Sequence, residues 1–391
     1  MPEQPPVPTD PADRRPGSGP SSAGWSAWVD EQLDALRAEG RWRFHRDLDA
    51  KGPTGTLAGR VVTAFASNDY LGLSAHPAVI AAARDAAERW GTGATASRLV
   101  VGNRPVHEEL EAAIADWKGM EAALVFPTGY QANVGVLSTL ATAGATVLSD
   151  ELNHASIIDG LRLGKADVHV YRHGDVDHIR SLLDAAPGRA IVVTDAVFSM
   201  DGDVAPVGEL LSVCAQHGAL LVLDEAHSVF GPEVDLSTGA EVLRVGTLSK
   251  ALGSLGGFVA GPTRYVELLL NRARSHIFTT GLSPTDAGAA LAALDVLRSA
   301  EGAALVEHLR RLVDRVRAGH PSPILPVVVG AETAALRAAE GLLERGLLVP
   351  AIRPPTVRAG TSRLRIALSA AHTEAQVDAL LTALTEIGIE P

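Results

Sequence analysis

The fold is decided by Leu220-Leu221-Val222-Leu223-Asp224-Glu225-Ala226-His227 and by Val242-Leu243-Arg244-Val245-Gly246-Thr247-Leu248-Ser249-Lys250. Each stretch is a short apolar run that ends in residues able to carry chemistry. Such runs are typical of strands that are buried on both faces of a parallel sheet. Because ligands bind beyond the carboxyl ends of these strands, we expect Asp224, His227 and Lys250 on one rim of the sheet.

The same pattern recurs between about residues 61 and 300. Apolar runs rich in β-branched residues alternate with longer Ala- and Leu-rich helical stretches. This alternation is typical of a mostly parallel sheet that is covered by helices on both faces. We therefore predict a three-layer, large α/β domain over residues 61–300, with strands at 122–126, 146–148, 168–171, 190–194, 220–224, 242–246 and 257–260.

The two ends of the chain differ from this central part. Residues 1–24 hold seven prolines and almost no large apolar residue, so we expect a disordered tail. Residues 25–60 are predicted to form an N-terminal helical arm, with an amphipathic helix from Trp25 to about Arg46 that places Trp28, Leu33 and Leu36 on one side. Residues 301–391 are predicted to form a smaller C-terminal α+β domain, with strands at 324–329 and 364–368.

Composition excludes several classes of protein. The net charge of −12 is the wrong sign for a protein that neutralises nucleic-acid phosphates. The single cysteine, Cys214, excludes an intrachain disulfide and a cysteine-based metal site, and its apolar surroundings indicate a buried position. We find no signal-peptide pattern and no apolar run long enough to span a bilayer. We expect a cytoplasmic enzyme that uses no metal and binds neither nucleic acid nor a membrane.

Polar residues follow two further predicted strands. Thr128-Gly129-Tyr130 follows 122–126 and opens a helix, whose free N–H groups could bind a phosphate. His154 follows 146–148, and its imidazole could stack on an aromatic ring. With a lysine that can form a Schiff base and a carboxylate that can keep a pyridine nitrogen protonated, these residues suit an aromatic aldehyde phosphate.

As an ordered set, these residues resemble the α-oxoamine synthase family of fold-type-I pyridoxal 5'-phosphate (PLP) enzymes. The resemblance runs from about Trp25 to the C-terminus. It is carried by residues 67–73, 93–99, 128–130, 153–156, 197–203, 224–227 and 247–250. It implies an aspartate aminotransferase-like fold, PLP as the cofactor, and a homodimer with shared active sites.

The resemblance also implies a role for individual residues. Lys250 carries the cofactor and later acts as the base, Asp224 pairs with the pyridine nitrogen, and His154 stacks on the ring. The remaining cofactor contacts are implied for His227 and Ser199 at the phenolic oxygen, for Gly129, Tyr130 and Thr247 at the phosphate, and for Thr279 and Thr280 at the phosphate of the partner subunit. Substrate contacts are implied for Asn68, Arg43, Thr356 and Arg365, the last of which takes the amino-acid carboxylate.

Residues 351–365 narrow the function. They look like the biotin-pathway members of the family, which condense L-alanine with a pimeloyl thioester and release carbon dioxide. The resemblance therefore implies a PLP-dependent acyltransferase whose acyl donor rides on coenzyme A or on an acyl-carrier protein. The alternative within the family is a member that uses glycine or serine and a different acyl-CoA.

Other interpretations of the same residues are weaker. Residues 224–227 spell the helicase DEAH box, but the chain has no phosphate-binding G-x-x-x-x-G-K-[ST] loop. The glycines at 91 and 93 resemble the start of a dinucleotide fingerprint without a clear preceding strand. His169 and His173 have metal-ligand spacing only on a helix, and they bracket a predicted strand end, so we expect a surface or turn role. A non-enzymatic cofactor-binding or nucleotide-dependent regulatory protein is the alternative from another class.

Overall fold

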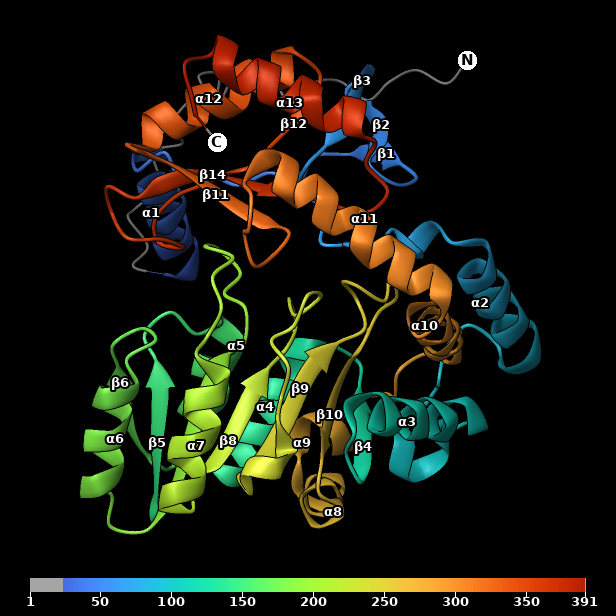
Figure 1. Cartoon of the computed structure of the whole chain (residues 1–391), viewed down its shortest axis with the longest axis vertical. Coiled ribbons are helices and arrows are strands. Elements are labelled where there is room, and N and C mark those ends of the chain that lie inside the picture. The colour runs from blue at the N-terminus through green and yellow to red at the C-terminus, as the bar shows by residue number, and fades with distance from the viewer. Residues whose placement is uncertain (1–23, 391) are drawn as a thin grey trace. The chain divides into compact units, whose positions relative to one another are not determined.

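The computed structural model describes residues 24–390 (Figure 1). The described chain forms two compact units, one ending at Asp47 and one beginning at Leu48. The predicted disordered tail lies outside the described residues, apart from Gly24. The large unit contains the sheet and the candidate site. The boundary near residue 300 between a large and a small domain stays a prediction.

The helical prediction for residues 25–60 is partly wrong. Helix α1 (Trp25–Ala38) ends well before Arg46, because Gly40 takes a left-handed conformation (φ 63°) that ends the helix. Residues 48–64 then form strands instead of a helical arm: β1 (Leu48–Ala50), β2 (Thr54–Leu57) and β3 (Arg60–Ala64) pair antiparallel in sequence. Ala58 and Gly59, both with positive φ, make the turn between β2 and β3.

The central sheet has seven strands in the order β4-β10-β9-β8-β7-β5-β6. β10 runs antiparallel to both of its neighbours, while the pairs from β9 to β6 are parallel. All seven strands predicted from the sequence are confirmed within one or two residues at each end. They are β4 (Ala122–Phe126), β5 (Ala145–Asp150), β6 (Asp167–Tyr171), β7 (Arg189–Asp195), β8 (Leu220–Asp224), β9 (Glu241–Thr247) and β10 (Gly257–Gly261).

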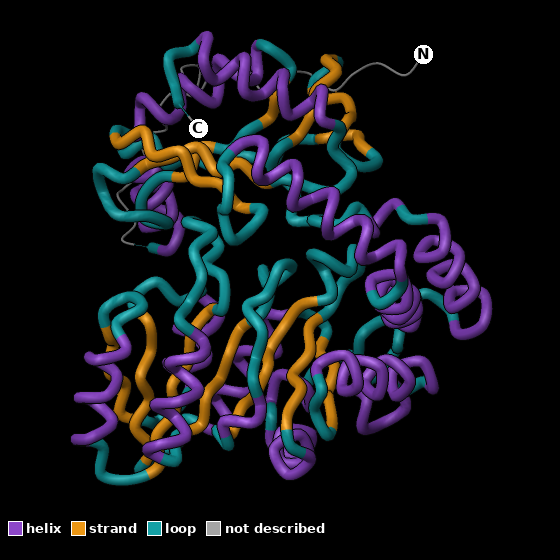
Figure 2. Tube along the Cα trace, viewed as in Figure 1, coloured by secondary structure: helices purple, strands orange, loops and turns teal. Residues whose placement is uncertain are grey.

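Helices cover both faces of this sheet (Figure 2). In β8, Leu221 and Leu223 pack among residues of α6 and α7, while Leu220 and Val222 pack among residues of α4, α5 and α8. Figure 1 shows α6 and α7 on the viewer's side of the sheet and α4 behind it. The predicted three-layer architecture is therefore confirmed. The helices are α4 (Gly129–Leu140), α5 (Ala155–Leu163), α6 (Val176–Ala185), α7 (Val207–His217), α8 (Thr263–Arg272) and the short α9 (Arg274–Ile277).

The C-terminal part forms a smaller sheet of order β11-β14-β13. Strands were predicted at 324–329 and 364–368, and the structure has β11 (Ile324–Gly330) and β14 (Ser362–Ala367). The short strands β12 (Leu347–Leu348) and β13 (Ala351–Ile352) were not predicted, and β12 pairs parallel with β3. The other helices are α2 (Pro77–Trp90), α3 (Pro105–Lys118), α10 (Pro284–Leu297), α11 (Ala300–Val316), α12 (Glu332–Glu344) and α13 (Glu374–Glu386), with short turns η2 (Leu73–Ala75), η3 (Arg98–Gly102) and η4 (Leu236–Thr238).

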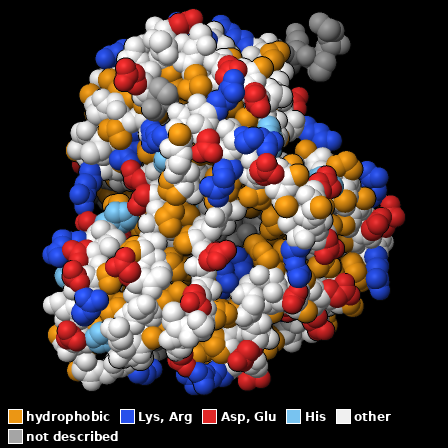
Figure 3. All heavy atoms as spheres, in the orientation of Figure 1, with side chains coloured by type: hydrophobic (Ala, Val, Ile, Leu, Met, Phe, Trp, Pro, Cys, Tyr) orange, Lys and Arg blue, Asp and Glu red, His pale blue; other side chains and the backbone are white. Residues whose placement is uncertain are grey.

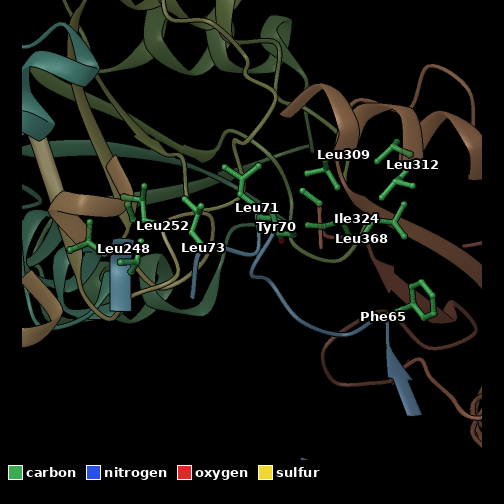
Figure 4. Close-up of a cluster of buried hydrophobic side chains, with 14 of the residues drawn as sticks. Phe65, Tyr70, Leu71, Leu73, Leu248, Leu252, Leu309, Leu312, Ile324 and Leu368 are labelled. Atoms are coloured by element: carbon green, nitrogen blue, oxygen red, sulfur yellow. The ribbon is translucent and has the colours of Figure 1, made fainter. Parts of the chain in front are cut away.

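One apolar cluster joins the central sheet of the large unit to the C-terminal sheet. Figure 4 shows Leu248 and Leu252, on either side of Lys250, in the same cluster as Tyr70 and Leu73. Buried residues of α11, β11 and the end of β14 belong to it as well. Because burial of each large side chain contributes about 1.5–3 kcal/mol, this cluster holds the C-terminal sheet against the rim that carries Lys250.

The surface of the described chain is mixed in charge. Figure 3 shows acidic and basic side chains interspersed over the visible face. Among residues 24–390, no helix combines the length and the apolar character that a membrane span requires. Cys214 is buried, as predicted.

Gly253 fixes the turn that carries Lys250. Its amide donates a hydrogen bond to the Lys250 carbonyl oxygen (2.9 Å), and its backbone is left-handed (φ 61°). A Cβ at this position would overlap the backbone of Ser74 and lie 2.7 Å from the carbonyl carbon of Leu73. Only glycine therefore allows the turn to approach η2 this closely.

We expect Gly253→Ala to lower the free energy of unfolding by at least about 2 kcal/mol, through the left-handed backbone and the backbone overlap. Urea unfolding followed by circular dichroism measures the change. Gly239→Ala is the matched control, because Gly239 is also left-handed (φ 78°) but has open space around it. Equal losses in the two variants would show that the close approach to Ser74 carries no energetic cost.

Candidate active site

A cavity of about 1290 Å³ lies beyond the carboxyl ends of β5, β7 and β8, with Lys250 in its wall. The C-terminal segment supplies the opposite wall, including Ile352 and Arg363. Its lining includes most of the side chains that the sequence predicts, namely Asn68, His154, Ser199, His227, Lys250, Thr356 and Arg365. The fold thus brings together residues as far apart in the chain as Asn68 and Arg365, which are 297 positions apart.

Lys250 lies in the turn after β9, where its amine is largely buried. Its Nζ atom is 2.9 Å from Nε2 of His227. Burial lowers the pKa of Lys250, and the negative charge of Asp224 opposes this shift in part. A lysine with a lowered pKa is more often deprotonated at neutral pH, and the neutral amine is the form that attacks an aldehyde.

A hydrogen-bonded chain continues from His227 into the N-terminal part of the large unit. His227 Nδ1 is 2.6 Å from the Tyr70 hydroxyl, which donates to Oδ1 of Asn68 (3.1 Å). Burial, together with the charges of Lys250 and Arg365, lowers the pKa of His227 well below its usual value. The ring is therefore neutral. Both ring nitrogens then have a hydrogen-bond partner, because Lys250 donates to Nε2 and Nδ1–H donates to the Tyr70 hydroxyl.

Asp224 lies buried at the end of β8, next to Asp195 in the register of β7 and β8. Its Oδ2 accepts a hydrogen bond from the Asn133 side chain of α4 (2.6 Å), and its Oδ1 accepts one from the Ala226 amide (2.9 Å). Asp195 accepts the backbone N–H of His154 (2.8 Å) and so sets the start of α5. Burial, which the charge of Asp224 reinforces, raises the pKa of Asp195 well above its ordinary value.

The start of α4 suits a phosphate. Thr128 caps the helix by accepting the Gln131 amide (3.1 Å), which leaves the first amides, of Gly129 and Tyr130, pointing out of the helix end. The backbone of Gly257 packs so closely against Gly129 that no side chain fits between them. Thr247 lies beside Gly129. A Cβ on that glycine would be only 3.2 Å from the Cβ of Thr247.

Arg365 enters the cavity from β14, where it is almost fully buried. Its Nε donates to the Ser199 carbonyl oxygen (2.5 Å), and its Nη2 donates to Oδ1 of Asn68 (3.2 Å). Among the described residues, no carboxylate pairs with it. We expected an anionic partner for a charge between Leu364 and Ile366, and the structure supplies neutral oxygens instead. The guanidinium keeps its charge available for an anionic ligand.

All the predicted cofactor and substrate contacts stay predictions, and three of the residues concerned, Arg43, Thr279 and Thr280, do not line the cavity. Arg43 belongs to the unit that ends at Asp47, which is not placed relative to the cavity. Thr280 is exposed after α9. Its neighbour Thr279 accepts a hydrogen bond from Gln131 of α4 in the same chain (3.4 Å), which places the segment near the helix start.

Two residues that were not singled out in the sequence, Tyr70 and Asn133, hold His227 and Asp224 in place. Tyr70 lies within the quoted 67–73 stretch, but its bond to His227 links residues far apart in the chain. Asn133 was visible as a polar residue on the buried side of α4, where Ala132, Val136 and Leu137 are apolar. A buried amide on such a face needs a partner, and this is the signal that could have identified it.

Comparison with known proteins agrees with this geometry. Residues 60–384 match the class I and II aminotransferase family. The chain is 49% identical over 380 residues to the 8-amino-7-oxononanoate synthase of Anaeromyxobacter sp. (strain K), with 92% of this chain and 95% of that protein covered. The chain belongs to the 8-amino-7-oxononanoate synthase family. The predicted α-oxoamine synthase membership is thereby confirmed.

Solved structures place the 8-amino-7-oxononanoate synthase family in fold type I. A serine palmitoyltransferase from S. paucimobilis with bound PLP and myriocin superposes with a TM-score of 0.85 at 32% identity, covering 92% of this chain and 98% of that one. An 8-amino-7-oxononanoate synthase from Francisella tularensis gives a TM-score of 0.68 at 26% identity, with 84% and 98% covered. The predicted aspartate aminotransferase-like fold is confirmed.

For this member of the 8-amino-7-oxononanoate synthase family, we expect Tyr70→Phe to destabilise the fold by about 1–3 kcal/mol, because His227 Nδ1 is left buried without a partner. Urea unfolding checks the change. Tyr265→Phe is the control, since the Tyr265 hydroxyl bonds to Glu241, which does not line the cavity. A Tyr70→Phe variant as stable as the wild type would contradict the hydrogen-bonded chain.

Proposed function

We propose that this chain is a PLP-dependent 8-amino-7-oxononanoate synthase, which condenses L-alanine with a pimeloyl thioester and releases carbon dioxide. The observation that carries the proposal is the buried Lys250 amine, 2.9 Å from His227, in one cavity with an arginine that has no carboxylate partner. Sequence identity of 49% to proteins of this name supports the choice of substrates. The acyl group is carried as a thioester of coenzyme A or of an acyl-carrier protein.

The residues at the rim fit the cofactor. The α4 amides of Gly129 and Tyr130, with Thr247, form a phosphate site, and Asp224 is a buried carboxylate able to accept a pyridinium N–H. Its position is fixed by Asn133. His154 is held at the start of α5 by its bonds to Asp195 and Ser156, and its imidazole lines the cavity at the height where a ring would stack.

Bound PLP would supply an electron sink that stabilises negative charge at the substrate Cα. Lys250 would bind the cofactor through Nζ, and its lowered pKa suits it to take a proton from the substrate Cα and return it. His227 holds the Lys250 amine from one side through Nε2. It would donate from Nε2 to a phenolic oxygen only in its other tautomer, in which the Tyr70 hydroxyl donates to Nδ1, and Ser199 would be the second donor. His154 would keep water from the ring face.

Substrate selection falls to residues from the other wall of the cavity. Arg365 would bind the carboxylate of L-alanine, and Asn68, which already accepts from Arg365, would orient it. Thr356 lines the cavity and would contact the acyl chain. A substrate contact of Arg43 is proposed from the family resemblance alone. The short side chains Ala66 and Ala155 leave room near the site for a methyl group.

Product identification separates this function from its relatives. Purified protein is incubated with L-alanine, glycine or L-serine, each with pimeloyl, acetyl, succinyl and palmitoyl thioesters. We expect one major product by mass spectrometry, 8-amino-7-oxononanoate from L-alanine and pimeloyl thioester. A palmitoyl product from L-serine would favour the activity of the serine palmitoyltransferases that share this fold.

Lys250→Ala should abolish turnover while leaving the unfolding midpoint within a few degrees of the wild type, because the side chain lines a cavity and supports no strand. The product assay and thermal unfolding are read on the same preparation. Lys165→Ala, on a surface loop after α5, is the control and should retain full activity. Residual turnover by Lys250→Ala above one part in a thousand would contradict the proposed role.

We also propose that the chain is a homodimer with shared active sites. Leu99, Val100 and Val101 of η3 and the adjacent Phe278 expose between 53% and 73% of their surface, which is unusual for four large apolar side chains in one region. A second copy would cover them and bring Thr279 and Thr280 to the partner's phosphate site. The cytoplasmic location stays a prediction.

The dimer is tested with Val100→Asp combined with Phe278→Asp. Light scattering should give twice the chain mass for the wild type and the mass of one chain for the variant, because two buried charges would face each other across the interface. Val328→Asp, on the exposed side of β11, is the control and should stay dimeric. A monomeric wild type would refute the shared site.

A further inference from the structure

His173 lies just past β6, in the wall of the cavity, and the proposed reaction gives it no role. The sequence predicted a surface or turn position; the structure has His173 in a turn and places its ring between two carboxylates. Its Nδ1 is 3.0 Å from Oδ1 of Asp150, and its Nε2 is 2.7 Å from Oδ2 of Asp203. A carboxylate only accepts, so both ring nitrogens donate and the ring is an imidazolium. These two bonds raise the pKa of His173 to about 10, so the ring is charged at neutral pH.

The two carboxylates belong to different parts of the rim. Asp150 is buried at the end of β5, where it also accepts the Gly174 amide (3.1 Å). Asp203 belongs to the loop that follows β7. The ring of His173 packs edge-on against Phe198, at the start of the same loop, with 4.4 Å between centroids. His173 therefore joins the loop after β7 to the body of the sheet.

That loop, residues 198–203, is closed on itself by backbone bonds. The Phe198 amide donates to the Asp203 carbonyl oxygen (3.0 Å), and the Gly202 amide donates to the Phe198 carbonyl oxygen (2.8 Å). Ser199 lies inside this loop, and its carbonyl oxygen accepts a hydrogen bond from Nε of Arg365. Movement of Asp203 would thus displace both Ser199 and the oxygen that holds Arg365.

The backbone of His173 reaches a second point on the wall. Its amide donates to Oε1 of Glu151 (3.1 Å), and Oε2 of Glu151 accepts from Nη2 of Arg358 (2.7 Å). Arg358 comes from the C-terminal segment, as does Arg363, which pairs with Asp201 of the loop. His173 thus orders the acceptors of three arginines. It contacts Glu151, the acceptor of Arg358, directly. Through the loop it orders Asp201 and the Ser199 carbonyl oxygen, the acceptors of Arg363 and Arg365.

We propose that His173 is a positioning residue for the candidate site, where its imidazolium ties Asp203 to Asp150 and so holds Ser199 and the Arg365 guanidinium in place. Its effect on turnover rests on the proposed function. The ordering of residues 198–203 does not, because it follows from the contacts alone.

Hydrogen exchange of the full-length protein tests the ordering. In His173→Gln, we expect the amides of Phe198 and Gly202 to exchange about tenfold faster, because a charge-assisted bond that holds the loop is lost. His169→Gln is the matched control, since His169 lies on β6, just before His173, and pairs with Asp167 (2.9 Å) away from the cavity. Wild-type exchange rates at Phe198 and Gly202 in His173→Gln would overturn the proposal.

Asp203→Ala removes the acceptor of the same bond and carries the test if His173→Gln does not fold. The double variant should exchange no faster than about twice the faster single variant, because one interaction is removed in all three proteins. Rate increases that multiply in the double variant would show that the two residues act separately, and would overturn the proposal.

Kinetics distinguish positioning from a general loss of structure. In His173→Gln, the KM for L-alanine should rise about tenfold while the KM for the pimeloyl thioester changes less than about twofold, because Arg365 is the group displaced. Equal rises in both constants would overturn the positioning role. If the wild type makes no product from these substrates, the proposed function fails, and the exchange experiment still decides the role of His173.

Discussion

The level at which the parallel strands end is the constraint on which the rest of the site depends. The register pairs Asp195 with Asp224 and Asp224 with Val245, so β7, β8 and β9 deliver their polar residues to one edge. The strands are buried on both faces, and only their carboxyl ends can carry charge without a large desolvation cost. A lysine, two histidines and two carboxylates are therefore concentrated in a small volume. Their mutual burial shifts the pKa values of Lys250, His154 and Asp195.

The C-terminal segment completes what the central sheet begins. Three of its arginines contact acceptors on the rim, which are an acidic side chain for Arg358 and for Arg363 and a carbonyl oxygen for Arg365. The shared apolar cluster keeps the two parts at a fixed distance, so the arginines need not supply the stability of the contact. The exposed Arg358–Glu151 pair contributes little stability on its own, whereas Arg363 and Arg365 are buried and serve orientation.

Much of the fold could be predicted because long apolar runs admit few interpretations. The seven central strands are such runs, and each was located from the sequence. The strands β1 and β2 were missed because they are short and mostly exposed, so they carry no strong apolar period. The predicted end of helix α1 lay too far along the chain, because the apolar pattern continues through Trp42 and Phe44. In the structure, Gly40 ends the helix.

The candidate site was predictable only in part. Lys250, Asp224 and His227 could be placed together because strand ends of one sheet must meet. The contacts of Tyr70 with His227 and of Asn133 with Asp224 join distant residues, and no spacing in the sequence encodes them. The turn position of His173 was predicted, but its contacts were not, since its two carboxylates lie 23 and 30 positions away.

The neutral surroundings of Arg365 have a consequence for how the protein behaves in solution. Among the described residues, this buried guanidinium donates to a carbonyl oxygen and an amide oxygen and pairs with no carboxylate, so it attracts any small anion that can enter the cavity. Chloride, formate and acetate would compete with an amino-acid carboxylate there, and weak acids in the buffer would act as inhibitors. Apparent affinities for the amino acid should therefore depend on which salt is present as well as on its concentration.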